Sequence, residues 1–117
     1  MSHTILVVED EVDQREMLRE ALELSGYAVV VAKDGKDALN KVSGIESLSL
    51  VILDLLMPEM NGWDFVEQLR TRPEFATVPI IVHSSARGPA PATVARVLTK
   101  PFPFDRLLAT VREYCAK

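Results

Sequence analysis

The fold is decided by the stretch Ile5-Leu6-Val7-Val8-Glu9-Asp10-Glu11, in which four branched aliphatic residues lead directly into three acidic ones. The same pattern returns at Leu50-Val51-Ile52-Leu53-Asp54. A short, continuous apolar run is typical of a strand that is buried on both faces of a parallel sheet. Because open α/β sheets bind ligands at the carboxyl ends of their strands, both stretches predict acidic side chains at that edge.

Strand and helix patterns alternate along the rest of the chain. Apolar residues at helical spacing predict helices over about 12–24, 36–42, 63–69 and 104–114, and apolar runs predict further strands over 27–32, 48–53, 80–83 and 94–98. Short joints between them favour an α/β fold, a five-stranded parallel sheet that is doubly wound with helices on both faces. Gly88, Pro89 and Pro91 stand where a fourth covering helix is due, so we expect that helix to be reduced or missing.

Composition restricts the classes of protein to consider. The chain has 117 residues, of which 48% are hydrophobic and 26% charged, and a net charge of −4. We expect one domain over residues 1–117, with no nucleic-acid surface because no basic patch stands out. A single cysteine, the lack of a charged-then-apolar leader and the lack of a long apolar run favour a cytoplasmic protein that has no membrane partner.

The acidic residues at the two strand ends predict a cation site. Glu9, Asp10 and Asp54 should converge at one edge of the sheet, where their charges repel one another. A divalent ion with oxygen ligands is the usual way to hold such carboxylates together, and Mg²⁺ is the expected ion if phosphate is involved. Taken singly, each acid could equally cap a helix or face water, so the prediction depends on the set.

Two further motifs complete a recognisable order along the chain. The loop from Asp54 to Gly62 reads Asp-Leu-Leu-Met-Pro-Glu-Met-Asn-Gly, and Thr99-Lys100-Pro101-Phe102 follows the last strand pattern. With the acidic pair after the first strand, these motifs make the chain resemble the receiver domain of bacterial two-component response regulators over essentially its whole length. The resemblance implies the flavodoxin-like (βα)5 arrangement of that family.

The resemblance also implies roles for individual residues. Asp54 matches the phosphoacceptor, and a carboxylate beside a metal at a strand end can act as a nucleophile toward phosphorus. Glu9 and Asp10 match the metal-holding acids, with Asp10 the more direct ligand, and the backbone carbonyl of Leu56 completes the protein's share of the shell. The implied cofactor is Mg²⁺, with Mn²⁺ as a substitute.

The remaining implied roles concern the newly formed phosphoryl group. Lys100 would contact its oxygens as a point charge, and Pro101 would aim the lysine through a cis Lys100–Pro101 peptide bond. Ser84 matches the hydroxyl that hydrogen-bonds the phosphoryl group and shifts toward it, and we prefer it to Ser85 from its offset to Asp54. His83 lies on an apolar strand, and we expect it to be a buried structural residue rather than a phosphorelay histidine.

The chain departs from the family in its signal-reading parts. Val97 stands where many members place an aromatic residue that couples to the switch hydroxyl, so that coupling cannot operate in its usual form. The short segment around Pro89 alters the usual output face. The chemistry of phosphorylation should survive, because none of its residues is lost.

These observations lead to one expected function and two alternatives. We expect a single-domain response regulator that transfers a phosphoryl group from a phosphohistidine, or from a small phosphodonor, to its own Asp54. It would not be a conventional enzyme. Its partners would be a sensor histidine kinase or phosphotransfer protein and a downstream protein target, and it would be a monomer or weak dimer. The main alternative is a pseudo-receiver that docks a partner without phosphorylation. A phosphatase acting through Asp54 ranks third, because Leu56 replaces the second acid that it would need.

Overall fold

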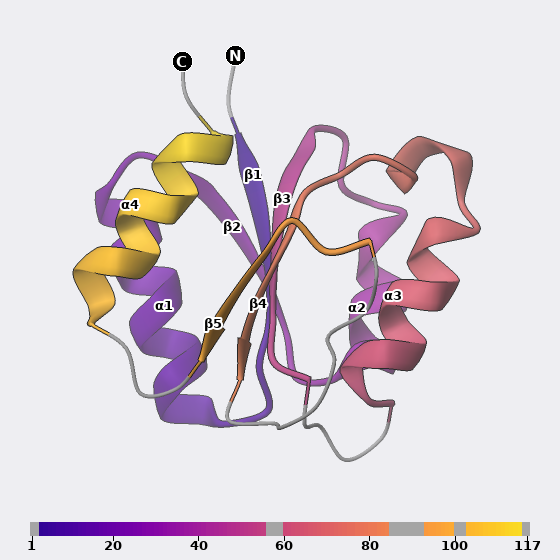
Figure 1. Ribbon diagram of the computed structural model, residues 1–117, viewed down its shortest axis with the longest axis horizontal. Coiled ribbons are helices and arrows are strands. Elements are labelled where there is room, and N and C mark those ends of the chain that lie inside the picture. Colours follow the sequence, from indigo (N-terminus) through magenta and orange to yellow (C-terminus); the bar gives the residue numbers. More distant parts are fainter. Residues whose placement is uncertain (1–2, 56–59, 85–92, 100–102, 116–117) are drawn as a thin grey trace.

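A parallel sheet of five strands forms the centre of the structure (Figure 1). The computed structural model describes residues 3–55, 60–84, 93–99 and 103–115. The strands are β1 (Thr4–Val8), β2 (Ala28–Ala32), β3 (Leu48–Leu53), β4 (Ile80–Ser84) and β5 (Arg96–Thr99). The helices are α1 (Val12–Leu24), α2 (Gly35–Val42), α3 (Gly62–Arg70) and α4 (Phe104–Tyr114), with a 3-10 turn η1 (Pro73–Phe75). The predicted α/β fold is therefore confirmed.

The strand order β2-β1-β3-β4-β5 determines where a ligand site can form. The chain passes from β1 outward to β2 and then returns to the other side of β1 to form β3. The connections that leave β1 and β3 therefore run to opposite faces of the sheet, which opens a crevice at the carboxyl ends of these two strands. Both acidic stretches end at this crevice.

The sheet is covered on both faces, as Figure 1 shows. Helices α2 and α3 lie on one face over a core cluster that includes Leu6, Val8 and Leu53, and α1 and α4 lie on the other over Ile5 and Ile52. Successive residues of β1 and β3 alternate between the two clusters, as the two-residue period of a strand requires. Every residue of Ile5–Val8 and Leu50–Leu53 has 0% exposed area, so these central strands have no freedom to shift.

Local signals explain where the helices begin and end. Gly26 has a φ of 95°, which lets the chain turn sharply after α1. Asp34 caps α2, because its side chain accepts a hydrogen bond of 2.8 Å from the backbone N–H of Asp37. Asn61 caps α3 in the same way, through the N–H of Asp64 at 2.9 Å. Asn61 lies at the end of the loop predicted from Asp54 to Gly62, where the sequence did not indicate its capping role.

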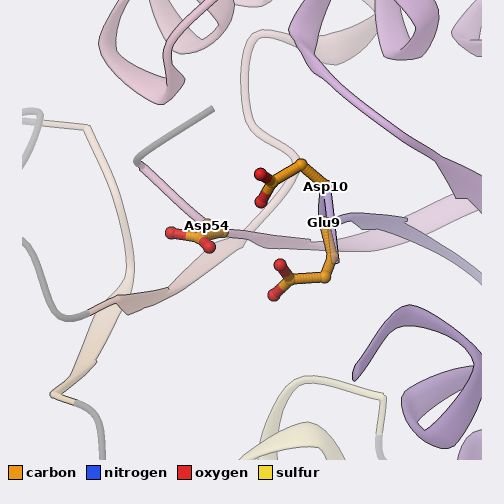
Figure 2. Close-up of side chains that lie close together, drawn as sticks. All are labelled: Glu9, Asp10 and Asp54. Carbon is orange, nitrogen blue, oxygen red and sulfur yellow. The ribbon is translucent and has the colours of Figure 1, made fainter. Parts of the chain in front are cut away.

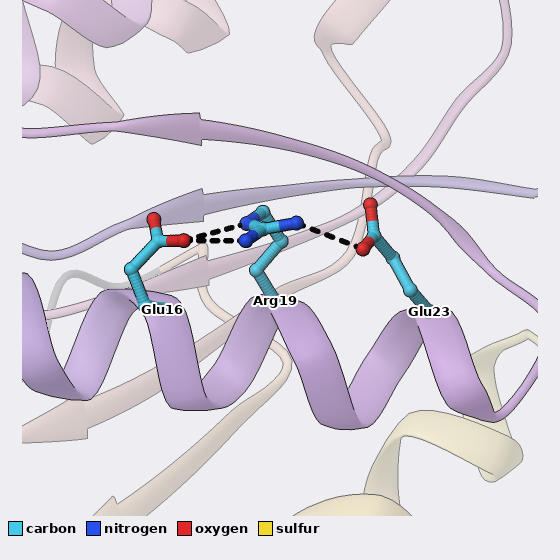
Figure 3. Close-up of polar contacts among 3 residues, drawn as sticks. All are labelled: Glu16, Arg19 and Glu23. Atoms are coloured by element: carbon cyan, nitrogen blue, oxygen red, sulfur yellow. Dashed lines mark hydrogen bonds and ion pairs between the residues drawn. The ribbon is translucent and has the colours of Figure 1, made fainter.

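The outer surface of α1 carries a short ladder of ion pairs (Figure 3). The guanidinium of Arg19 donates to Glu16 through Nε at 2.9 Å and to Glu23 through Nη1 at 2.9 Å. The hydrogen bond from Arg19 lowers the pKa of the Glu16 carboxyl group. These charges face water, so they keep this surface polar and contribute little to stability.

The structure differs from the sequence prediction mainly around β5. The strand begins at Arg96 rather than Val94, because the residues before Arg96 are held by other contacts. Val94 packs against the core, and the guanidinium of Arg70 donates to the hydroxyl of Thr93 at 3.2 Å and to its carbonyl at 3.0 Å. Residues 93–95 form a turn and a bend, and the described residues between β4 and β5 contain no helix. The segment 85–92, where the fourth helix was predicted to be reduced, lies outside the described residues. Within the described ranges, no helix is long and apolar enough to cross a membrane.

Gly62 is needed where α3 meets the end of β3. A Cβ atom at this position would lie 2.7 Å from Leu55 Cα, which is backbone that cannot move aside. Gly62→Ala should therefore lower the free energy of unfolding by roughly 1–3 kcal/mol, through overpacking. Urea unfolding monitored by circular dichroism measures this change.

Gly44→Ala is the matched control for that prediction. A Cβ atom on Gly44 would meet only the carbonyl of Lys41, at an ordinary 3.6 Å. We expect its stability to stay within about 0.5 kcal/mol of the wild type. Equal effects of the two substitutions would mean that the close approach to Leu55 does not limit the fold.

Candidate functional site at the carboxyl edge of the sheet

Three carboxylates meet at the carboxyl edge of the sheet. Glu9 and Asp10 follow β1, and Asp54 follows β3. The strands bring them together because Val8 pairs with Leu53 and the N–H of Asp54 donates to the carbonyl of Val8 at 3.0 Å. Ligand oxygens of all three acids lie within 4.8 Å of one another, and Figure 2 shows their carboxyl groups turned to the same side. The predicted convergence of these acids is therefore present.

The three acids differ in their exposure to water. Glu9 is 1% exposed and Asp54 is 6% exposed, whereas Asp10 is exposed at the mouth of the site. Burial strengthens the repulsion between negative charges, because the protein interior screens them less than water does. Such a set of oxygen donors fits a hard divalent cation, which would offset the repulsion.

The carboxylate of Glu9 is held in a defined orientation. Its Oε2 accepts a hydrogen bond from the backbone N–H of Glu11 at 3.2 Å. The backbone carbonyl of Glu9 accepts another hydrogen bond, from Arg15 Nη1 at 3.0 Å, which ties the loop after β1 to the first turns of α1. The other carboxylate oxygen, Oε1, lies 3.7 Å from Nε2 of His83 on β4.

The sequence correctly predicted that His83 is buried, but not that it lies close to the acids. It is 2% exposed, which confirms the predicted burial. Its approach to Glu9 was missed, because the two residues are 74 positions apart and lie on strands that are not neighbours. The strand register indicates the approach. Val82 pairs with Leu53, so the residues that follow them, His83 and Asp54, occupy neighbouring positions at the same edge of the sheet.

The structure describes only some of the other residues predicted for the site. Ser84 ends β4 and pairs in register with Thr99, the last residue of β5, so the ends of these two strands lie at the same edge of the sheet as the acids. The side chain of Ser84, the carbonyl of Leu56, and Lys100 and Pro101 lie outside the described residues. Val97 lies on β5 opposite Val82 and is 47% exposed.

Comparison with known families gives a match over nearly the whole chain. Residues 5–112 match the family described as the response regulator receiver domain. Among curated proteins, the chain is similar to an uncharacterised transcriptional regulatory protein, YrkP, of Bacillus subtilis, with 36% identity over 97% of this chain and 52% of that protein. It is also similar to the response regulator MprA of Mycobacterium bovis, with 38% identity over 96% of this chain and 50% of that protein. The chain thus spans about half the length of these relatives.

Solved structures show the same similarity over their full length. The chemotaxis protein CheY4 of Vibrio cholerae superposes with a TM-score of 0.89 and 29% identity, over 97% of this chain and 99% of that chain. The response regulator TrrA of Thermotoga maritima, solved in complex with Mg²⁺ and BeF, superposes with a TM-score of 0.83 and 31% identity, over 97% and 99% of the two chains.

Removing one charge from the acidic cluster should stabilise the metal-free protein. In EDTA, Asp10→Asn is expected to raise the free energy of unfolding by about 1 kcal/mol and the melting temperature by about 4 °C, because it relieves repulsion at the edge of the sheet. Millimolar Mg²⁺ should raise the melting temperature of the wild type and leave the variant nearly unchanged.

Glu46→Gln is the control for that experiment, because Glu46 is an exposed acid on the loop before β3 and lies outside the cluster. It should respond to Mg²⁺ as the wild type does and melt at nearly the same temperature in EDTA. A rise equal to that of Asp10→Asn would assign the effect to net charge rather than to the cluster.

Proposed function

Because this chain belongs to the response regulator receiver domain family, we propose that it catalyses Mg²⁺-dependent phosphorylation of its own Asp54 and thereby switches a protein–protein interaction. Receiver domains act in two-component signalling, where histidine kinases phosphorylate them. The donor would be a phosphohistidine on a sensor kinase or phosphotransfer protein, or a small phosphodonor. The observation that carries the proposal is the convergence of the Glu9, Asp10 and Asp54 oxygens within 4.8 Å at the carboxyl edge of the sheet.

The position of Asp54 suits a nucleophile. Its backbone is fixed by the hydrogen bond to the carbonyl of Val8, and its side chain is 6% exposed, so the carboxylate reaches the site without being surrounded by bulk water. In the proposed step a carboxylate oxygen of Asp54 forms a bond to phosphorus while the bond from phosphorus to the donor's histidine nitrogen breaks. The products are an aspartyl phosphate and the free donor histidine.

Charge stabilisation accounts for the rest of the chemistry. Glu9 and Asp10 would hold Mg²⁺ with Asp54 and the carbonyl of Leu56, and the ion would neutralise phosphoryl oxygens as charge develops on them. Lys100 would contact the same phosphoryl group as a point charge. Ser84 would donate a hydrogen bond to the product, which would bias the end of β4 toward one of two arrangements.

The output of the switch would differ from that of a typical receiver. A half-exposed valine at position 97 cannot report a shift of Ser84 in the way a large aromatic side chain could. We propose that the downstream partner is a protein that contacts other surfaces, with the receiver acting as a cytoplasmic monomer or weak dimer. A pseudo-receiver that docks its partner constitutively is the second candidate, but such a protein has no need to keep three mutually repelling acids.

The central test is intact mass after incubation with acetyl phosphate and Mg²⁺. The wild type should gain a single phosphoryl group, and the gain should vanish in EDTA. Asp54→Asn should remain unmodified, because its amide is not a nucleophile toward phosphorus under these conditions.

Asp64→Asn provides a matched control, since Asp64 is an exposed acid in the first turn of α3 and lies outside the cluster. This variant should be phosphorylated like the wild type. If the wild type gained no phosphoryl group from acetyl phosphate or from any histidine kinase tested, the pseudo-receiver would become the better explanation.

A further inference from the structure

One row of side chains crosses the sheet at the site. Val8 pairs with Leu53, and Leu53 pairs with Val82, so the next residues along the three strands form a row. These residues are Glu9 on the β1 side, Asp54 in the middle and His83 on β4. Strand β3 lies between β1 and β4, so the 3.7 Å approach of Glu9 Oε1 to His83 Nε2 spans the strand that carries Asp54.

Both members of this pair are almost completely removed from water, with 1% of Glu9 and 2% of His83 exposed. A buried carboxylate is costly unless polar or charged groups surround it. A ring nitrogen that faces a carboxylate presents its N–H, because two sets of lone pairs would repel. At 3.7 Å the contact is too long for a direct hydrogen bond but close enough for the N–H dipole of the ring to attract the carboxylate.

The two oxygens of Glu9 are therefore directed by different parts of the chain. Oε2 is held by the N–H of Glu11 in the loop after β1, and Oε1 faces His83 on β4. With both contacts present, an oxygen of Glu9 also lies within 4.8 Å of ligand oxygens of Asp10 and Asp54. The orientation that satisfies His83 is thus compatible with the convergence of the three acids.

We propose that His83 is a positioning residue for the cation site, which keeps the carboxylate of Glu9 turned toward Asp10 and Asp54. This inference rests on the proposed function, in which these acids bind Mg²⁺. Groups that orient metal ligands from outside the coordination shell typically change metal affinity by tenfold or more when they are removed. Without His83, the Glu9 carboxylate would lose its attraction toward β4 and would spend part of its time turned away from the other two acids.

A packing role is the competing explanation, since His83 also fills space on the face of the sheet that carries Ile81 and Leu98. The two explanations differ in what a replacement must supply. Packing requires only volume, whereas positioning requires an N–H that faces Glu9. Glutamine and methionine form a matched pair for this purpose, because both side chains are unbranched and of similar length but only glutamine carries an N–H.

The experiment measures Mg²⁺ affinity without any phosphorylation. Melting temperatures of the wild type, His83→Met and His83→Gln are recorded against MgCl₂ concentration at constant ionic strength, and the dissociation constant follows from the concentration dependence. His83→Met should bind Mg²⁺ about tenfold more weakly than the wild type. His83→Gln should recover most of that loss, to within about threefold of the wild type.

A double-mutant cycle shows whether the effect passes through Glu9. In the Glu9→Gln background, His83→Met should change the Mg²⁺ affinity less than twofold, because the carboxylate that His83 positions is absent. An undiminished tenfold loss in that background would overturn the proposal, as would equal Mg²⁺ affinities of the wild type and His83→Met. If His83→Met did not fold, His83→Val would serve as the second apolar replacement and would be judged by the same comparisons.

Failure of this inference is distinguishable from failure of the proposed function. A wild type that binds Mg²⁺ and is phosphorylated, together with a methionine variant that binds Mg²⁺ equally well, would remove only the role of His83. A wild type whose melting temperature does not respond to Mg²⁺ would contradict the cation site itself, and with it both proposals.

Discussion

Repulsion among three carboxylates at the edge of the sheet is the constraint on which the rest of the structure depends. Glu9, Asp10 and Asp54 converge within 4.8 Å, although like charges at this distance favour separation. They are kept together by the strands behind them, because Ile5–Val8 of β1 and Leu50–Leu53 of β3 are buried on both faces and pair residue by residue. The apolar core therefore holds charged groups in an arrangement that is unfavourable until a cation offsets their repulsion.

Packing around the crevice serves the same arrangement from the α3 side. Gly62 lets the first turn of α3 approach the backbone of Leu55, and its N–H donates to the Leu55 carbonyl at 2.9 Å. The residue after Asp54 is thus held against the first turn of α3. On the opposite side of β3, the contact between Glu9 and His83 joins β1 to β4, so the strand that carries Asp54 is enclosed from both directions.

Arg70 ties α3 to the segments that lead into β4 and β5. Arg70 at the end of α3 donates to the carbonyls of Phe75 and Val78 and to both polar atoms of Thr93, and burial lowers the pKa of its guanidinium. This single side chain anchors the approach to β4 and the approach to β5 on α3. Val97 on β5 is left 47% exposed.

The amino-acid sequence is enough to predict the order of strands and helices, the parallel sheet and the convergence of the acids, because the apolar period and the acidic strand ends are local patterns that the core must satisfy. The sequence also predicts the end of α1 near Leu24. The caps formed by Asp34 and Asn61 are local too, since each side chain bonds the N–H three residues ahead, but they were not predicted. The start of β5 and the approach of Glu9 to His83 depend on the folded arrangement of the whole chain. Both depend on contacts between distant segments, such as Arg70 with Thr93, and a one-residue change of register would have put His83 on the other face of the sheet.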